Sequence, residues 1–268
     1  MSADMTQDRG LALIDEMLAE GASTIRAEDV RSRLEISPQA ASNLLRRLAD
    51  AGLLERVRPG SYAIRGLGVL GTTSASERLA VAVAAAVPGI THRIGYRSAL
   101  DELGLLVHPA RTVQVAVIRQ VRKSSISGRP LRTIIEAPRK IHKGAQRDGP
   151  SWISTLERAL LDAAARPRLV GGIGVLAEAL DTASSKIDPI RLTQLADELT
   201  WGAPLRRIGS IVDRLEIEGL SSQLIPLAPP SADIELEPQG PETTRWRDTR
   251  WWVRWNYEPH ELENVIEH

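Results

Sequence analysis

The sequence predicts an α+β protein built from two domains of unequal size. Three observations predict this fold class. Residues 1–66 show three helical patterns followed by a hairpin pattern, residues 67–76 are rich in glycine and small polar side chains, and residues 77–268 mix helical and strand patterns. We therefore expect a small domain at 1–66, a linker at 67–76 and a larger mixed α/β domain at 77–268.

The composition is that of an ordinary water-soluble globular protein. The 268 residues suffice for two cores, and the apolar and charged fractions are 43% and 25%. No apolar run approaches the roughly 20 residues of a membrane span, and the acidic start is not a secretory signal. The absence of cysteine excludes disulfides and thiolate sites and indicates the cytoplasm. Five scattered histidines give no metal-binding pattern, so we expect no metal and no cofactor.

Three helices are expected in the first domain. Apolar periodicity predicts helices over 7–20 and 24–34. A third is expected from 38 to about 51, because Ser37 is a preferred N-cap, Pro38 suits the first helical position and Gly52 ends the pattern. The inward positions of the first two helices are Leu11, Ile14, Met17, Leu18, Ile25, Val30 and Leu34.

Two strands, 53–57 and 61–65, follow the third helix and are joined by a turn at 58–60 that contains proline and glycine. Three helices followed by a hairpin make a winged helix-turn-helix. The stretch from Arg31 to Arg65 carries seven arginines against three acids, although the net charge of the whole chain is zero. This excess of positive charge is a plausible footprint for nucleic acid.

The third helix has two distinct faces. Ala41, Leu44, Leu45 and Leu48 follow the i, i+3, i+4, i+7 spacing of a buried stripe. The opposite face then carries side chains that hydrogen-bond base edges and phosphates, and two arginines flank the hairpin turn, where they can meet phosphates or a minor groove. We predict DNA binding through Gln39, Ser42, Asn43, Arg46, Arg47, Arg56 and Arg58. The alternatives are a solvated face or a protein-interaction module.

The second domain mixes helices and strands. Helices are expected over 77–87, 92–103, 154–165, 174–183, 188–199 and 204–215, and strands over 111–119, 130–136 and 251–257. Ser154 and Glu157 have capping-box spacing, and Pro189 suits a first helical position. The glycines at 171–174 lack the lysine and preceding strand of a phosphate-binding loop, so a turn between helices is expected.

Four segments occur in the order found in AbiEi-type antitoxins: RVRPGSY at 56–62, SALDELGL at 98–105, TLERALLD at 155–162 and RRIGSIV at 206–212. The chain resembles this family over most of its length. The resemblance implies a bacterial antitoxin of a type IV toxin–antitoxin, or abortive-infection, system. Its winged helix would repress its own operon at inverted repeats of double-stranded DNA, and its C-terminal domain would counteract a nucleotidyltransferase-like toxin. Neither activity is catalytic. The tryptophans at 246–255 match no family motif.

Charged and aromatic groups of the second domain have simpler interpretations. Glu157, Arg158 and Asp162 are expected to form local ion pairs without a catalytic role. Trp251, Val253 and Trp255 share one face of a strand, which favours a core position over base stacking.

A second basic block lies between residues 111 and 147, where ten lysines and arginines accompany one acid, Glu136. Its members can form a solvated face, bind DNA backbone, or bind an acidic partner surface. The residues expected on this surface are Arg119, Arg122, Lys123, Arg129, Arg132, Arg139, Lys140 and Lys143.

Two other function classes compete with the DNA-binding antitoxin. A winged-helix transcription factor whose second domain senses a small molecule would need an apolar pocket with a few convergent polar groups. A nucleic-acid enzyme would need clustered acids or metal-ligand spacing, and the sequence contains no Asp-x-Asp, HExxH or Gly-x-Ser-x-Gly pattern.

Overall fold

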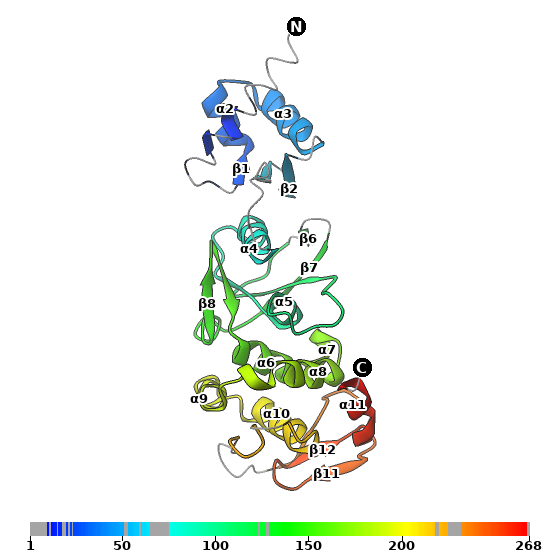
Figure 1. Cartoon of the computed structure of the whole chain (residues 1–268). Coiled ribbons are helices and arrows are strands. Elements are labelled where there is room, and N and C mark those ends of the chain that lie inside the picture. Colours follow the sequence, from blue (N-terminus) through cyan, green and yellow to red (C-terminus); the bar gives the residue numbers. More distant parts are fainter. Residues whose placement is uncertain are drawn as a thin grey trace. The chain divides into compact units, whose positions relative to one another are not determined.

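The computed structural model describes residues 10, 12–14, 16–17, 20, 22, 24–50, 53–58, 60–64, 75–122, 124–126, 129–217, 220–224 and 232–266. The chain divides into two compact units, the first with residues 1–90, 121–132 and 148–151 and the second with 91–120, 133–147 and 152–268. Helices and strands are mixed throughout, which confirms the predicted α+β class (Figure 1). Within the described ranges, no helix has the length and apolar character of a membrane span.

The first unit contains the predicted winged helix. Residues 10, 12–14, 16 and 17 are helical, and Leu11 and Leu18 lie outside the described residues. The elements that follow are β1 (Thr24–Arg26), α2 (Ala27–Leu34), α3 (Pro38–Asp50), β2 (Leu54–Arg58) and β3 (Ser61–Ile64). The third helix and both hairpin strands are confirmed within one residue of their expected bounds.

The second predicted helix begins three residues later than expected. Thr24–Arg26 forms strand β1, which pairs antiparallel with β3 and places Ile25 opposite Tyr62. Two β-branched residues favour the extended backbone here, and pairing with the hairpin satisfies backbone groups that a helix N-terminus leaves free. The three strands have the order β1-β3-β2. Ile25 and Val30 are buried, and Leu34 is half-buried.

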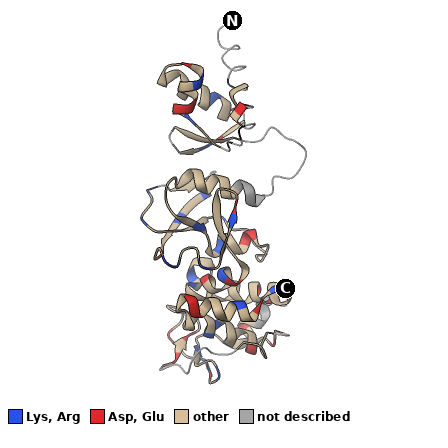
Figure 2. Ribbon diagram, turned by 90° about the vertical axis from the view of Figure 1, so that its left-hand side faces the viewer, with Lys and Arg blue, Asp and Glu red and all other residues tan. Residues whose placement is uncertain are grey.

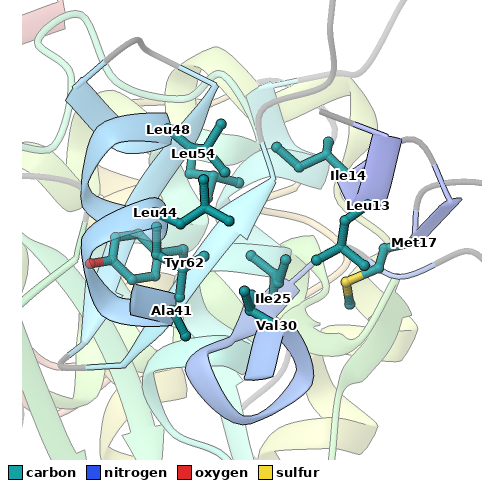
Figure 3. Close-up of a cluster of buried hydrophobic side chains, with 11 residues drawn as sticks. Leu13, Ile14, Met17, Ile25, Val30, Ala41, Leu44, Leu48, Leu54 and Tyr62 are labelled. Carbon is teal, nitrogen blue, oxygen red and sulfur yellow. The ribbon is translucent and has the colours of Figure 1, made fainter. Parts of the chain in front are cut away.

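An apolar cluster holds this part of the chain together. Figure 3 shows side chains from α3, β1, α2 and the hairpin pointing toward one another. Ala41, Leu44, Leu45 and Leu48 are at most 2% exposed, so the predicted inward face of α3 is confirmed. Ser37 caps this helix, since its Oγ accepts a hydrogen bond from the Ala40 amide at 3.2 Å.

Six further strands are β4 (His92–Ile94), β5 (Val113–Val117), β6 (Ser125–Ile126), β7 (Arg129–Ile135), β8 (Ala145–Asp148) and β9 (Ser151–Ser154). They form a sheet with the order β6-β7-β5-β4-β9-β8, and β7, β8 and β9 each contain residues of both units. The expected strands over 111–119 and 130–136 are confirmed as β5 and β7. Strands β6, β8 and β9 were not predicted, because they are short and lack a clear apolar alternation. Helix α4 (Ala75–Ala86) precedes these strands, and helix α5 (Tyr96–Glu102) follows β4.

The helix expected over 92–103 is wrong in its first residues. His92–Ile94 forms strand β4, which places Ile94 opposite Val115 of β5 and opposite Ile153 of β9. Because β4 pairs on both sides, its backbone groups are satisfied by neighbouring strands, and the helix α5 begins only at Tyr96.

Four further helices of the second unit agree with the prediction: α6 (Leu156–Ala165), α8 (Ile173–Ala183), α9 (Pro189–Leu199) and α10 (Gly202–Arg214). The short helix α7 (Pro167–Val170) was not predicted. Gly171 and Gly172 have φ of 112° and 106° and form the expected turn between helices. The N-cap of α6 is Thr155, which accepts a hydrogen bond from the Arg158 amide at 3.5 Å, and not Ser154 as predicted. Ser154 instead ends strand β9.

The C-terminal segment forms a small sheet and a last helix. The sheet has the order β10-β12-β11, with β10 (Ile234–Glu235), β11 (Trp246–Asp248) and β12 (Val253–Trp255), and α11 spans Pro259–Ile266. Trp251, Val253 and Trp255 are fully buried, which confirms the core position predicted for them. The strand expected over 251–257 is shorter than predicted, since β12 begins only at Val253 and Trp251 precedes it.

Helix α10 binds this segment through polar contacts. Arg206 donates from Nε to the Trp251 carbonyl at 2.7 Å, and Arg207 donates from Nε to the Glu235 carbonyl at 2.8 Å. Burial lowers the pKa of Arg207 to about 10. Ser210 donates to Asp248 at 2.6 Å. The RRIGSIV segment is therefore structural, because its arginines and serine satisfy groups of an irregular chain segment.

Gly209 of α10 faces Trp251, and a Cβ at this position would lie 2.2 Å from Cζ2 of the Trp251 ring. We expect G209A to lower the free energy of unfolding by about 1–3 kcal/mol or more through overpacking, which corresponds to a fall of roughly 2–12 °C in Tm. The matched control is G202A in the same helix, where a Cβ meets nothing within 4 Å. Equal Tm values for the two variants in thermal unfolding would contradict this packing.

Candidate nucleic-acid interface

The outer face of α3 is open to solvent as predicted. Gln39, Ser42, Arg46 and Arg47 are exposed, and Asn43 is half-buried. These residues share one face because the opposite one is fixed by the buried leucines. The face therefore brings amide, hydroxyl and guanidinium groups together on a single helix, and these are the groups that read base edges in a major groove.

One hydrogen bond joins two side chains on this face. Arg46 donates from Nη2 to Oδ1 of Asn43 at 3.4 Å. The side chains of Gln39, Ser42 and Arg47 make no hydrogen bond or ion pair with other residues of the described ranges. They are available to an external partner.

The hairpin contributes an exposed arginine. Arg56 is exposed on β2, opposite Tyr62 of β3. A register shift between Arg56 and Arg58 turns Val57 into the core, where it is 1% exposed. The side chain of Arg58 lies outside the described part of the chain.

Not every arginine of the first domain is free. Arg33 of α2 binds both carboxylate oxygens of Glu20, at 2.9 and 2.6 Å, and lies 3.6 Å from Glu16. Both acids belong to the segment that precedes β1, so Arg33 anchors that segment to α2. The hydrogen bond to Glu20 raises the pKa of Arg33. We therefore exclude Arg33 from the set of cations offered to a phosphate backbone.

The second basic block divides between the two units. Arg122, Arg129 and Arg132 belong to the first unit, Arg119, Arg139, Lys140 and Lys143 belong to the second, and Lys123 lies outside the described residues. Figure 2 shows lysine and arginine spread over many elements among acidic residues. Arg119, Arg122, Arg132 and Arg139 are exposed, and Arg129 is half-buried.

Two lysines of this block have structural partners. Lys143 Nζ donates to the Glu198 carbonyl at 2.7 Å, and Lys140 Nζ donates to the Leu199 carbonyl and to Thr200 Oγ1, the latter at 3.0 Å. These carbonyls end α9, where a helix has unpaired acceptors and a partial negative charge. Lys140 and Lys143 thus cap α9, and the freely exposed set is smaller than the sequence indicates.

A buried cluster of charges lies in the second unit. The Arg93 guanidinium donates to Asp162 at 2.6 Å and to Glu136 at 2.9 Å. Arg158 donates to the same two carboxylates, at 2.9 and 2.8 Å. Tyr96 also donates to Glu136 at 2.7 Å. The local Arg158–Asp162 pair was predicted, but the distant partners Arg93 and Glu136 were not.

The cluster is closed and electrically balanced. Arg93, Arg158 and Asp162 are 0% exposed. Burial alone would raise the pKa of Asp162, but the charges of Arg93 and Arg158 hold it below its usual value. No buried side-chain nitrogen or oxygen within the described ranges is without a hydrogen bond. A cluster without exposed or unpaired groups offers nothing to a substrate, so we interpret it as structural.

Glu157, the other acid of that segment, lies outside the cluster and accepts a hydrogen bond from the Asp188 amide at 3.4 Å. No group of three or more histidine, aspartate or glutamate side chains in the described residues could hold a metal ion.

Comparisons with known proteins agree with the winged helix. Residues 13–65 match a family model described as "Transcriptional regulator, AbiEi antitoxin". No curated protein matches the chain. Among solved structures, the chain is similar to the crystal structure of the RV2827C protein from Mycobacterium tuberculosis, with a TM-score of 0.63, 16% identity, and coverage of 96% of this chain and 94% of that one. This second likeness is one of fold. The resemblance to AbiEi-type regulators is thus confirmed over residues 13–65.

Removal of one arginine from the buried cluster should destabilise the protein, because it leaves buried carboxylates with fewer partners. R93M leaves two buried carboxylates with Arg158 as their one remaining guanidinium partner. We expect a loss of about 3–5 kcal/mol in the free energy of unfolding, measured in urea. The control is R191M, which removes an exposed ion pair with Glu198 at 3.0 Å and should cost no more than about 1 kcal/mol. Similar losses in both variants would contradict the burial of the cluster.

Proposed function

We propose that this protein is a DNA-binding antitoxin that represses its own operon. The winged helix binds double-stranded promoter DNA at inverted repeats, and the C-terminal domain counteracts a nucleotidyltransferase-like toxin in the cytoplasm. The observation that carries the proposal is the outer face of α3, on which amide, hydroxyl and guanidinium groups stand free over a leucine core. The family match of residues 13–65 supports the same conclusion.

Each group on this surface has a role in the proposal. Arg46 presents guanidinium donors to guanine, and Gln39 can pair with adenine through its amide. Ser42 can hydrogen-bond either a base edge or a phosphate. Arg47, Arg56 and Arg58 neutralise phosphates on either side of the groove and set the register of the helix. Of the expected linker at 67–76, residues 67–74 lie outside the described part of the chain, and Ala75 and Ser76 belong to α4.

The antitoxin role rests on the family resemblance of the second domain. Its quoted segments build the fold: Arg158 and Asp162 enter the buried cluster, and the arginines at 206 and 207 hold the C-terminal sheet. The partner surface must therefore be sought among exposed groups. Arg119, Arg122, Arg132 and Arg139 suit an acidic partner or additional DNA backbone.

The proposal predicts a defined loss for one variant of α3. R46A should weaken binding to a duplex of the protein's own promoter by about 1–3 kcal/mol, because a bidentate contact with a base is lost. Fluorescence anisotropy at low ionic strength measures the change. The control is K186A, which removes an exposed cation of the second unit and should leave the affinity unchanged. Equal affinities for wild type and R46A, or no binding by the wild type, would contradict the proposal.

The antitoxin role predicts rescue of growth. Co-expression with a nucleotidyltransferase-like protein encoded beside the gene should restore growth that this neighbour alone arrests. Reversal of Arg119, Arg122, Arg132 and Arg139 to glutamate, with Lys140 and Lys143 kept so that α9 stays capped, should reduce either rescue or promoter affinity. Growth arrest that persists beside the wild-type protein would refute the antitoxin role. Unchanged rescue and unchanged affinity after the reversal would exclude these four arginines as binding residues.

A further inference from the structure

The hydrogen bond between Arg46 and Asn43 distinguishes these two residues from the rest of the α3 face. We propose that Asn43 does not read a base but positions the Arg46 guanidinium, so that Arg46 reads guanine. The inference rests on the proposed binding of DNA by α3 and names the chemistry by which that helix selects a sequence.

The donors and acceptors of the pair support this division of roles. To pair with adenine, an asparagine must offer its oxygen as acceptor and its nitrogen as donor at the same time. Oδ1 of Asn43 accepts from Nη2 of Arg46 at 3.4 Å, which engages one of its two lone pairs, so an adenine would have to share this oxygen with the guanidinium. A guanidinium has five N–H donors in a fixed plane. Arg46 therefore keeps enough donors for the two acceptors of guanine while one donor is held by Asn43.

Position and burial also fit. Residues three apart on a helix are neighbours on its surface, and Asn43 is half-buried whereas Arg46 is exposed. The less exposed side chain is the better restrained of the two and can serve as the support. A long arginine loses rotamer freedom when it binds, so a contact that already orders it in the free protein lowers that cost.

The neighbouring residues lack this arrangement. Arg47 has no side-chain partner among the described residues, which suits contact with a phosphate at no fixed orientation. Gln39 is exposed one turn before Asn43 and makes no hydrogen bond with Arg46. The pair is thus a local feature, and Gln39 provides a matched control on the same face.

The test is selection of binding sites from a randomised duplex library by wild type, N43A, N43D, R46A, Q39A and the double variants N43A/R46A and Q39A/R46A. Wild type should prefer guanine at one position of each half-site. N43A and R46A should both relax that same preference, by about 5- to 150-fold for R46A. N43A/R46A should lose no more than R46A alone, whereas Q39A should relax a different position and add to R46A.

The conservative variant N43D separates positioning from reading. Aspartate keeps the acceptor for Arg46 but has no donor for adenine, so the guanine preference should survive even if the added negative charge lowers affinity for all sequences. The inference is overturned if N43A relaxes an adenine position and leaves the guanine preference intact. A wild type that binds no duplex, or binds all duplexes equally, overturns the proposed function as well.

Discussion

The orientation of α3 about its own axis is the constraint on which the account of this protein depends. Four aliphatic side chains, Ala41, Leu44, Leu45 and Leu48, are buried in the core of the winged helix. Burial of each leucine stabilises the fold by about 1.5–3 kcal/mol. Rotation of the helix would expose them and bury unpaired amide or guanidinium groups, which is costly. The same residues that hold the domain together therefore decide which side chains meet a ligand.

The second unit differs from the winged helix in that its core contains charged side chains. Two guanidiniums from β4 and α6 pair with two carboxylates, Asp162 of α6 and Glu136, which directly follows β7, and all four side chains are buried. Gly95 permits this arrangement, since a Cβ there would lie 2.6 Å from Nη1 of Arg93. Buried networks of this kind are strict in geometry and penalise alternative packings. We regard this cluster as the contact that fixes α6 against β4.

Prediction from sequence succeeded where structure is decided locally. The outer and inner faces of α3 follow from the spacing of its leucines, and the turn at Gly171 and Gly172 follows from glycine chemistry. It failed where pairing with residues distant in the sequence determines the structure. The stretch around His92 has helical spacing but forms a central strand, because it pairs with β5 and β9. The buried charge of Arg93 is neutralised by Glu136 and Asp162, which are distant in the sequence.

The basic block shows the same limit at the level of the candidate site. Eight cations between residues 119 and 143 predict a positive surface, but Lys140 and Lys143 cap the C-terminal end of α9, which lies more than fifty residues later in the sequence. The sequence gives the number of charged side chains but does not show which of them form hydrogen bonds or ion pairs within the folded protein. Arg33 is a second example, since its partners Glu16 and Glu20 precede it by more than three turns of helix and belong to another segment.

The most direct measurement of the central claim is site-specific photocrosslinking to the promoter duplex. A photoreactive side chain replaces Ser42 on the outer face of α3 or, as the reference, Thr182, which is exposed on α8. The account predicts a protein–DNA adduct from position 42 that an excess of unlabelled promoter removes, and no adduct from position 182. The absence of an adduct at 42, or equal yields at both positions, would contradict the claim that α3 lies against the duplex.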